Sequence, residues 1–149
     1  MNPTLFNLVL ADDDMDDCIF FQEALEELPY TTELTTVKDG VELMQLLTEK
    51  SDTLPDALYL DLNMPRKTGF ECLIEIKQND KLKRLPVIIF STSFNPEAVK
   101  RLHEQGANYY IRKPSDFSDL KKIISLSLDL LSQDNPQTTT ENFVINGKQ

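Results

Sequence analysis

The amino-acid sequence predicts an α/β fold, a doubly wound sheet of five parallel strands covered by helices on both faces. The main observation is the spacing of apolar residues, which changes back and forth along the chain between the period of a strand and that of a helix. Five such strand and helix pairs follow one another with short connections. Alternating units of this kind form a parallel sheet, because each helix carries the chain back across the sheet.

The five strands are expected where short apolar runs occur. These runs are Leu5–Ala11, Leu34–Val37, Ala57–Asp61, Val87–Phe90 and Tyr109–Arg112. The fourth run has no polar alternation, which is typical of a strand that is buried on both faces of a parallel sheet.

A stripe of apolar residues at helical spacing follows each strand. The stripes predict helices over residues 18–28, 40–47, 70–79, 96–106 and 120–131. The first helix is expected to stop before Pro29, because the residue before a proline is disfavoured in helical geometry. Pro96 suits the first turn of the fourth helix, and Gly106 suits its end.

Length and composition agree with one globular domain. The chain has 149 residues, 40% of them hydrophobic and 27% charged, which is enough to bury a core without disulfides. We expect a domain over residues 1–131 and a tail over residues 132–149, where Gln, Asn, Thr and Gly replace the apolar stripes. The tail is expected to be mobile unless Phe143, Val144 and Ile145, a short β-prone cluster, dock on the domain or on a second copy of it.

Charge and cysteine content indicate the setting of the protein. A formal net charge of −10 argues against a nucleic-acid surface and favours protein partners. No apolar run is long enough to span a membrane, and the first residues lack the basic and apolar parts of a secretion signal. Cys18 and Cys72 have neither zinc-site nor disulfide-framework spacing, so we expect free thiols in a reducing compartment. These features predict a cytoplasmic protein.

The sequence contains no nucleotide-binding loop. Neither GxGxxG nor GxxxxGK(S/T) occurs, and the four glycines, at positions 40, 69, 106 and 147, are too far apart to form a glycine-rich loop. Any phosphate group must therefore be held by side chains and a metal ion.

Polar side chains stand where four of the predicted strands end. They are, in chain order, Asp12 and Asp13, Asp61, Ser91 and Lys113. The carboxyl ends of parallel strands meet at one edge of the sheet, so we expect these side chains to converge there.

These residue types fit the transfer of a phosphoryl group. An ionised Asp61 can attack phosphorus. Asp12 and Asp13 can share the shell of a Mg²⁺ ion, since carboxylates about 4 Å apart repel by roughly 4 kcal/mol at an effective dielectric near 20 unless a cation or a proton lies between them. Lys113 can neutralise charge on the phosphoryl group, and the Ser91 hydroxyl can donate a hydrogen bond to one of its oxygens.

Three further acids, Asp14, Asp16 and Asp17, follow the acidic pair. They could be additional ligands of the cation. We favour the alternative that one of them caps the first helix and the others interact with the positive end of that helix.

In this order and spacing, the strand-end motifs resemble the receiver domain of two-component response regulators, over roughly residues 5 to 131. The matching segments are Leu10–Asp14, Leu60–Pro65 together with Gly69, Phe90–Thr92 and Tyr110–Pro114. The resemblance implies the (βα)5 flavodoxin-like receiver fold. Within the family, the chain looks most similar to the small single-domain regulators, including those paired with bacteriophytochromes.

The resemblance implies which residues carry the chemistry. Asp61 corresponds to the phosphoacceptor, and Asp12 and Asp13 correspond to the acidic pair that binds Mg²⁺ together with it. The backbone carbonyl of Asn63 completes the protein's share of the metal shell.

Three other positions match the family in the same way. Lys113 corresponds to its invariant lysine, which is usually followed by a cis proline, here Pro114. Ser91 and Tyr110 correspond to the switch hydroxyl and the switch aromatic. Two departures, Ser91 in place of the commoner threonine and Thr68 in place of an acidic residue before the glycine, remove no reacting group.

The function that the resemblance implies is that of a single-domain response regulator in a two-component phosphorelay. The protein would take a phosphoryl group from a sensor histidine kinase or a phosphotransfer protein, and would catalyse its own phosphorylation and autodephosphorylation rather than turn over a separate substrate. The modified protein would then change its binding surface for a downstream protein target. Family members often use the face of the fourth helix, fifth strand and fifth helix to bind targets or to dimerise. The resemblance therefore implies that a homodimer can form through that face.

Two other functions are compatible with parts of the sequence. A phosphorylation-independent pseudo-receiver scaffold would bind partners without phosphate, although all the reacting groups are present. An aspartyl-phosphate phosphohydrolase of the haloacid-dehalogenase type would need a second acid two residues after Asp61, where this chain has Asn63.

Overall fold

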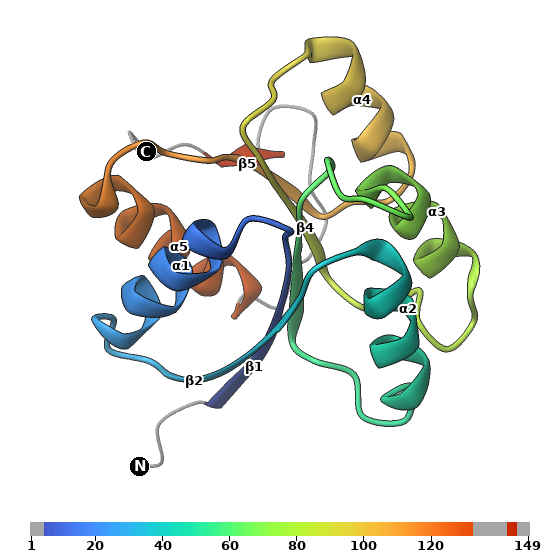
Figure 1. Cartoon of the computed structure of the whole chain (residues 1–149), viewed down its shortest axis with the longest axis horizontal. Helices are drawn as coiled ribbons and strands as arrows, with labels where there is room; N and C mark the ends of the chain where they lie inside the picture. Colours follow the sequence, from blue (N-terminus) through green and yellow to red (C-terminus); the bar gives the residue numbers. More distant parts are fainter. Residues whose placement is uncertain (1–4, 133–142, 146–149) are drawn as a thin grey trace.

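The structure of the protein is a computed structural model, and it describes residues 5–132 and 143–145. Figure 1 shows a central sheet with helices on both sides of it. Within the described residues, no helix combines the length and the apolar character needed to cross a membrane.

The sheet has six parallel strands in the order β2-β1-β3-β4-β5-β6. In chain order they are β1 (Leu5–Ala11), β2 (Thr31–Val37), β3 (Ala57–Leu60), β4 (Val87–Ser91), β5 (Tyr109–Arg112) and β6 (Val144–Ile145). The direction of winding reverses at β1, because β2 lies on one side of it and β3 on the other. Open α/β sheets bind ligands at such a reversal, outside the carboxyl ends of the strands.

Five helices cover the sheet. They are α1 (Met15–Glu26), α2 (Gly40–Glu49), α3 (Gly69–Gln78), α4 (Pro96–Glu104) and α5 (Phe117–Leu131). In Figure 1, α1 and α5 lie on one side of the sheet, and α2, α3 and α4 lie on the other. Each side has its own core cluster, with Leu43, Leu73 and Leu102 in one and Phe21 and Ile124 in the other. The predicted doubly wound fold is therefore confirmed.

The sheet has one strand more than the sequence predicted, and this strand comes from the expected tail. The backbone N–H of Tyr110 donates to the carbonyl of Phe143 at 3.0 Å, and Val144 pairs with Tyr110 in register. Phe143 and Ile145 are 1% and 2% exposed, so the β-prone cluster docks on its own domain. The mobility expected of the rest of the tail concerns residues 133–142 and 146–149, which lie outside the described residues.

The second strand also begins earlier than expected, at Thr31 rather than Leu34. Its first residues are polar, so they do not belong to an apolar run. They extend the strand because they pair with β1, with Thr31 opposite Leu5. A strand at the edge of a sheet needs one buried face at most, and apolar periodicity therefore underestimates its length.

Aromatic packing sets the relative positions of β3 and β4. The ring of Phe21 on α1 lies edge to face against Tyr59 at 4.8 Å and against Phe90 at 5.5 Å between centroids. The fully buried Tyr59 hydroxyl lies 2.6 Å from Ser127 Oγ on α5. The two strands pair with Leu60 opposite Ile89, so Asp61 and Ser91 come to the same edge of the sheet.

Two helix caps bear on the candidate site. Asp14 is the N-cap of α1 and accepts from the backbone N–H of Asp17, which confirms that one of the loop acids caps the first helix. Thr68 is the N-cap of α3 and forms a capping box with Glu71. The departure from the family pattern at Thr68 therefore has a structural role.

Candidate functional site

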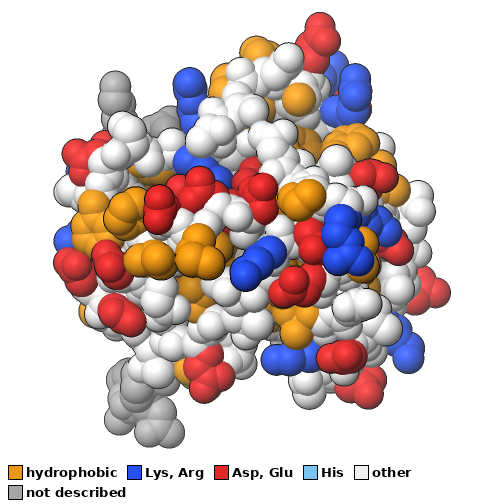
Figure 2. Space-filling model, in the orientation of Figure 1, with side chains coloured by type: hydrophobic (Ala, Val, Ile, Leu, Met, Phe, Trp, Pro, Cys, Tyr) orange, Lys and Arg blue, Asp and Glu red, His pale blue; other side chains and the backbone are white. Residues whose placement is uncertain are grey.

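The predicted acidic residues converge at the carboxyl edge of the sheet. Asp12 and Asp13 follow β1, and Asp61 follows β3; one carboxylate oxygen of each lies within 4.8 Å of the others. Asp12 and Asp61 are buried, whereas Asp13 is exposed. Figure 2 shows acidic side chains gathered over the place where, in Figure 1, β1 leads into α1. Carboxylates this close together require a cation or a proton between them.

Lys113, which follows β5, supplies one positive charge to the cluster. Its Nζ donates to Oδ2 of Asp12 at 2.7 Å and to Oδ2 of Asp17 at 2.8 Å. A longer bond of 3.3 Å reaches Oδ2 of Asp61. The Lys113 side chain is only 9% exposed, and its Nζ lies 5.4 Å from the centroid of the Phe90 ring. The lysine is thus held within the site before any ligand arrives.

The electrostatics of the site favour a bound proton or metal ion. Burial raises the pKa of Asp12 to about 6, although the hydrogen bonds from Lys113 and from the Asp14 backbone act in the opposite direction. Burial would lower the pKa of Lys113, but its hydrogen bonds to Asp12 and Asp17 outweigh that effect and raise it. Lys113 therefore keeps its charge at neutral pH, while its single charge faces several carboxylates. A cluster of carboxylate oxygens with excess negative charge fits a hard divalent cation such as Mg²⁺.

The loop between β3 and α3 folds back over Asp61. The backbone N–H of Gly69 donates to the carbonyl of Leu62 at 3.1 Å, and a Cβ on Gly69 would lie 2.2 Å from the carbonyl oxygen of Asp61. A glycine is required at this close approach. The backbone N–H of Asn63 donates to Oδ1 of Asp61 at 3.3 Å. The loop thus orients the Asp61 carboxylate, with Oδ2 on the side of Lys113.

A second contact ties the same loop to α2. Arg66 has a φ of 68°, in the left-handed region that non-glycine residues seldom adopt. Its Nη1 lies 3.3 Å from Oδ2 of Asp39, the N-cap residue of α2. The hydrogen bond from the Glu42 backbone and the charge of Arg66 lower the pKa of Asp39. No local sequence pattern predicts this pair, because its partners are 27 residues apart.

Ser91 and Tyr110 are buried on the neighbouring strands β4 and β5 and share a partner. The Ser91 hydroxyl accepts from the backbone N–H of Ser93 at 3.2 Å, and the Tyr110 hydroxyl donates to the carbonyl of Ser93. Burial raises the pKa of Tyr110, against the effect of the Ser91 hydroxyl. The Tyr110 ring packs edge to face on Phe94 at 5.9 Å. Both hydroxyls are therefore linked to the loop between β4 and α4.

The structure adds a partner for Asp17 and differs from the expectation at Pro114. Asp17 lies in the first turn of α1, at the positive end of the helix as expected, and it also binds Lys113, which lies 96 residues away in the chain. No local pattern reveals such a partner. The peptide bond between Lys113 and Pro114 is trans, as are all peptide bonds in the described part of the chain, so the implied cis proline is not found.

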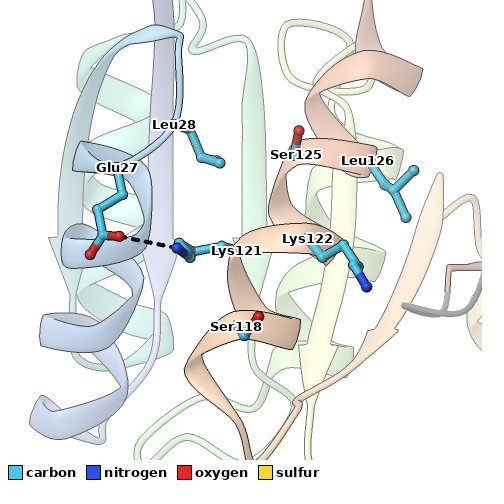
Figure 3. Close-up of a pocket in the computed structure, with 7 residues that line it drawn as sticks. All are labelled: Glu27, Leu28, Ser118, Lys121, Lys122, Ser125 and Leu126. Atoms are coloured by element: carbon cyan, nitrogen blue, oxygen red, sulfur yellow. Dashed lines mark hydrogen bonds and ion pairs between the residues drawn. The ribbon is translucent and has the colours of Figure 1, made fainter.

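The surroundings of the acidic cluster are partly apolar. Met15, Ile19 and Phe20 on α1 are exposed to 63%, 46% and 50%, and Figure 2 shows hydrophobic side chains beside the acidic ones. A separate shallow pocket lies between α1 and α5, where Lys121 forms an ion pair of 3.1 Å with Glu27 (Figure 3). The acidic cluster does not line that pocket. Because the three carboxylates converge at the carboxyl edge of the sheet, that edge is the candidate site.

One family of known proteins matches most of the chain. The family model described as response regulator receiver domain matches residues 8–125. The response regulator Rcp1 of Synechocystis sp. (strain ATCC 27184 / PCC 6803 / Kazusa) is 36% identical over 121 residues, which cover 78% of this chain and 82% of that protein.

Solved structures of similar proteins have the same fold. The phosphorylated cyanobacterial phytochrome response regulator RcpA superposes with a TM-score of 0.79 at 34% identity, covering 89% of this chain and 97% of that one. The Mn²⁺-bound form of Rcp1 has a TM-score of 0.76 at 33% identity, with 89% and 99% covered. The bacteriophytochrome response regulator AtBRR has a TM-score of 0.69 at 26% identity, with 84% and 92% covered.

Proposed function

The chain belongs to the response regulator receiver domain family of two-component signalling, and on this premise we propose that it accepts a phosphoryl group on Asp61. The donor is the phosphohistidine of a sensor histidine kinase or of a phosphotransfer protein. The observation that carries the proposal is the position of Asp61, whose carboxylate lies beside Asp12 and Asp13 and within 3.3 Å of the Lys113 ammonium.

The proposed transfer uses one carboxylate oxygen as the nucleophile. An oxygen of Asp61 attacks phosphorus, an O–P bond forms while the N–P bond of the phosphohistidine breaks, and the histidine nitrogen leaves with the electron pair. Lys113 balances the negative charge of the phosphoryl oxygens, and the Ser91 hydroxyl donates a hydrogen bond to one of them. Later attack by water releases phosphate, so the protein limits its own signal and turns over no separate substrate.

The proposed reaction depends on Mg²⁺. The ion would be held by the carboxylates of Asp12, Asp13 and Asp61 and by the backbone carbonyl of Asn63. Support comes from the convergence of the three carboxylates and from the Mn²⁺-bound form of the similar Rcp1. An oxygen-only donor set suits a hard divalent cation, which when bound stabilises negative charge on phosphoryl oxygens.

The proposed output is a change in the surface around β5. When Ser91 turns toward a phosphoryl oxygen, it gives up the hydrogen bond from the backbone N–H of Ser93. The hydroxyl of Tyr110 donates to the carbonyl of the same Ser93, so Tyr110 becomes free to move. Because β6 covers the outer edge of β5, the family's α4, β5 and α5 face is here a surface of α4, β6 and α5, and a movement of Tyr110 reaches it through the paired Val144. That face is our candidate for binding a downstream protein target or a second copy of the chain.

We place this function in the cytoplasm, with proteins rather than nucleic acid or membrane as partners. A net charge of −10 disfavours a phosphate backbone as a binding partner. Cys18 and Cys72 are free thiols, which are typical of proteins in a reducing compartment.

The proposal is tested by phosphorylation with acetyl phosphate. Wild type with Mg²⁺ should gain one phosphoryl group by intact mass, the label should be lost at alkaline pH, and a chelator should prevent its formation. Asp61→Asn should remain unlabelled, whereas Asp52→Asn, which removes an exposed acid outside the site, should label like wild type. Equal labelling of Asp61→Asn would refute the assignment of the phosphoacceptor. A wild type that accepts no phosphoryl group would favour the pseudo-receiver scaffold.

A further inference from the structure

We propose that Asp17 is a positioning residue that competes with the phosphoryl group for the ammonium of Lys113, and that it thereby weakens the binding of the phosphoryl group and shortens its lifetime. The inference rests on the proposed phosphorylation of Asp61 and extends it to a residue outside the strand-end motifs.

The first support is the geometry of the contact. Asp17 lies in the first turn of α1, and its Oδ2 is 2.8 Å from Lys113 Nζ, closer than the 3.3 Å from that nitrogen to Asp61. The Asp17 side chain is 33% exposed and that of Lys113 9%, so the pair is partly shielded from water. A hydrogen bond between two charged groups under such shielding is stronger than one on the open surface.

The second support is the number of hydrogen-bond donors. A lysine ammonium has three N–H groups. In this structure they face three carboxylates, those of Asp12, Asp17 and Asp61. A phosphoryl group on Asp61 must therefore share an ammonium that Asp17 already holds.

The third support is that Lys113 has other contacts that hold it in place. Its backbone N–H donates to the carbonyl of Ser91 at 2.8 Å, and its side chain is buried against Asp12 and over the ring of Phe90. Removal of the Asp17 carboxylate should therefore leave the lysine in the site. The dominant effect should be the loss of a competing negative charge and not the loss of an anchor.

Asp17 acts through Lys113 and not through the metal ion. The three carboxylates that can jointly hold a cation are those of Asp12, Asp13 and Asp61, and Asp17 is not one of them within the described residues. Its effect should therefore appear in the affinity for a phosphoryl mimic at saturating Mg²⁺.

The test is a titration of the whole protein with beryllofluoride at saturating Mg²⁺. Asp17→Asn should bind the mimic about threefold to tenfold more tightly than wild type, and its acyl phosphate should persist longer by a similar factor. Asp16→Asn is the matched control, because Asp16 is exposed, carries the same charge on the same helical turn and, within the described residues, is not among the carboxylates that form an ion pair with Lys113. This control should stay within about twofold of wild type.

Two further measurements separate competition from a structural role. Asp17→Glu keeps the charge within reach of Lys113 and should return the affinity toward the wild-type value. The NMR signal of the Lys113 ammonium should shift in Asp17→Asn without any ligand and should not shift in Asp16→Asn. A merely structural role would lower the melting temperature and leave the affinity for the mimic unchanged.

Other results of the beryllofluoride titration would overturn either the inference or the proposed function. Weaker or unchanged binding by Asp17→Asn would overturn the inference, and so would an equal gain in Asp16→Asn, which would indicate a general effect of net charge. A wild type that does not bind beryllofluoride with Mg²⁺ would instead overturn the proposed function, on which this inference depends.

Discussion

The ammonium of Lys113 at the end of β5 lies 3.3 Å from Oδ2 of Asp61 at the end of β3, although β4 separates the two strands in the sheet and 52 positions separate the residues in the chain. The Lys113 side chain is long enough to cross β4 and contact Asp61. This contact places the lysine's positive charge on one carboxylate oxygen of the buried Asp61, while the backbone N–H of Asn63 donates to the other.

Replacement of Asp13 should weaken the binding of Mg²⁺. Asp13 is exposed, yet its carboxylate shares the cluster with Asp12 and Asp61. Asp13→Asn should lower the Mg²⁺ affinity about tenfold, which is roughly 1.4 kcal/mol for one lost charged partner. Isothermal titration calorimetry measures this, with Asp52→Asn as the control. Unchanged affinity would place the metal elsewhere.

The affinity for Mg²⁺ should depend on pH. Burial raises the pKa of Asp12 to about 6, so at pH 5 most Asp12 carboxyl groups carry a proton that must leave before the ion binds. The affinity for Mg²⁺ should rise about tenfold between pH 5 and pH 7.

The stability of the metal-free protein should also depend on this carboxyl group. The raised pKa of Asp12 means that the folded chain binds the proton more tightly than the unfolded chain, so the contribution of Asp12 to stability falls as the pH rises toward 6. In Asp12→Asn, neither the tenfold rise in Mg²⁺ affinity nor the fall in stability should occur. If they persist, a group other than Asp12 titrates.

Removal of the Ser91 hydroxyl should separate phosphorylation from switching. Ser91→Ala should still accept a phosphoryl group, because Asp61 and the acidic pair are intact. The amide chemical shifts of residues 91–113 should respond weakly to beryllofluoride, since the hydroxyl that links the phosphoryl group to Ser93 and Tyr110 is missing. Thr92→Ala removes a neighbouring exposed hydroxyl and should respond like wild type. Equal shifts in Ser91→Ala and wild type would exclude Ser91 from the switch.

Loss of the buried Phe143 side chain, which directly precedes β6, should destabilise the domain. Phe143 is 1% exposed and packs against His103 at 4.6 Å and Tyr110 at 6.5 Å between ring centroids. Phe143→Ala should cost about 2 to 4 kcal/mol and lower the melting temperature by roughly 5 to 10 °C. Phe20→Ala, at a side chain that is 50% exposed, should change it little.

Truncation after Ser132 extends the same test to the whole tail. The shortened protein should melt at a lower temperature and keep its molar mass in light scattering, because Tyr110 pairs with Phe143 and Val144 of its own chain. An unchanged melting temperature would support a tail that is mobile throughout. A fall from dimer to monomer would mean that the segment docks on a second copy.

The repeating part of the fold could be predicted from the sequence because its signals are local. The continuous apolar run Val87–Phe90 indicates the strand β4 without knowledge of its neighbours, and the positions of Asp12, Asp61 and Lys113 follow from where such runs end. Parallel strands place their carboxyl ends at one edge, so the convergence of these residues also followed. The boundaries of β2 were less predictable, because an edge strand tolerates polar residues on its exposed faces.

The sequence by itself therefore determined the five strand and helix units, the doubly wound sheet and the residues that meet at its carboxyl edge. Only the tertiary structure decided that Asp17 binds Lys113, that Arg66 pairs with Asp39, and that Val144 and Ile145 form a sixth strand on β5. The physical reason is the range of the interactions. Periodicity and capping act between residues a few positions apart, whereas the partner of a charged side chain or of an open sheet edge is chosen by proximity after the chain has folded.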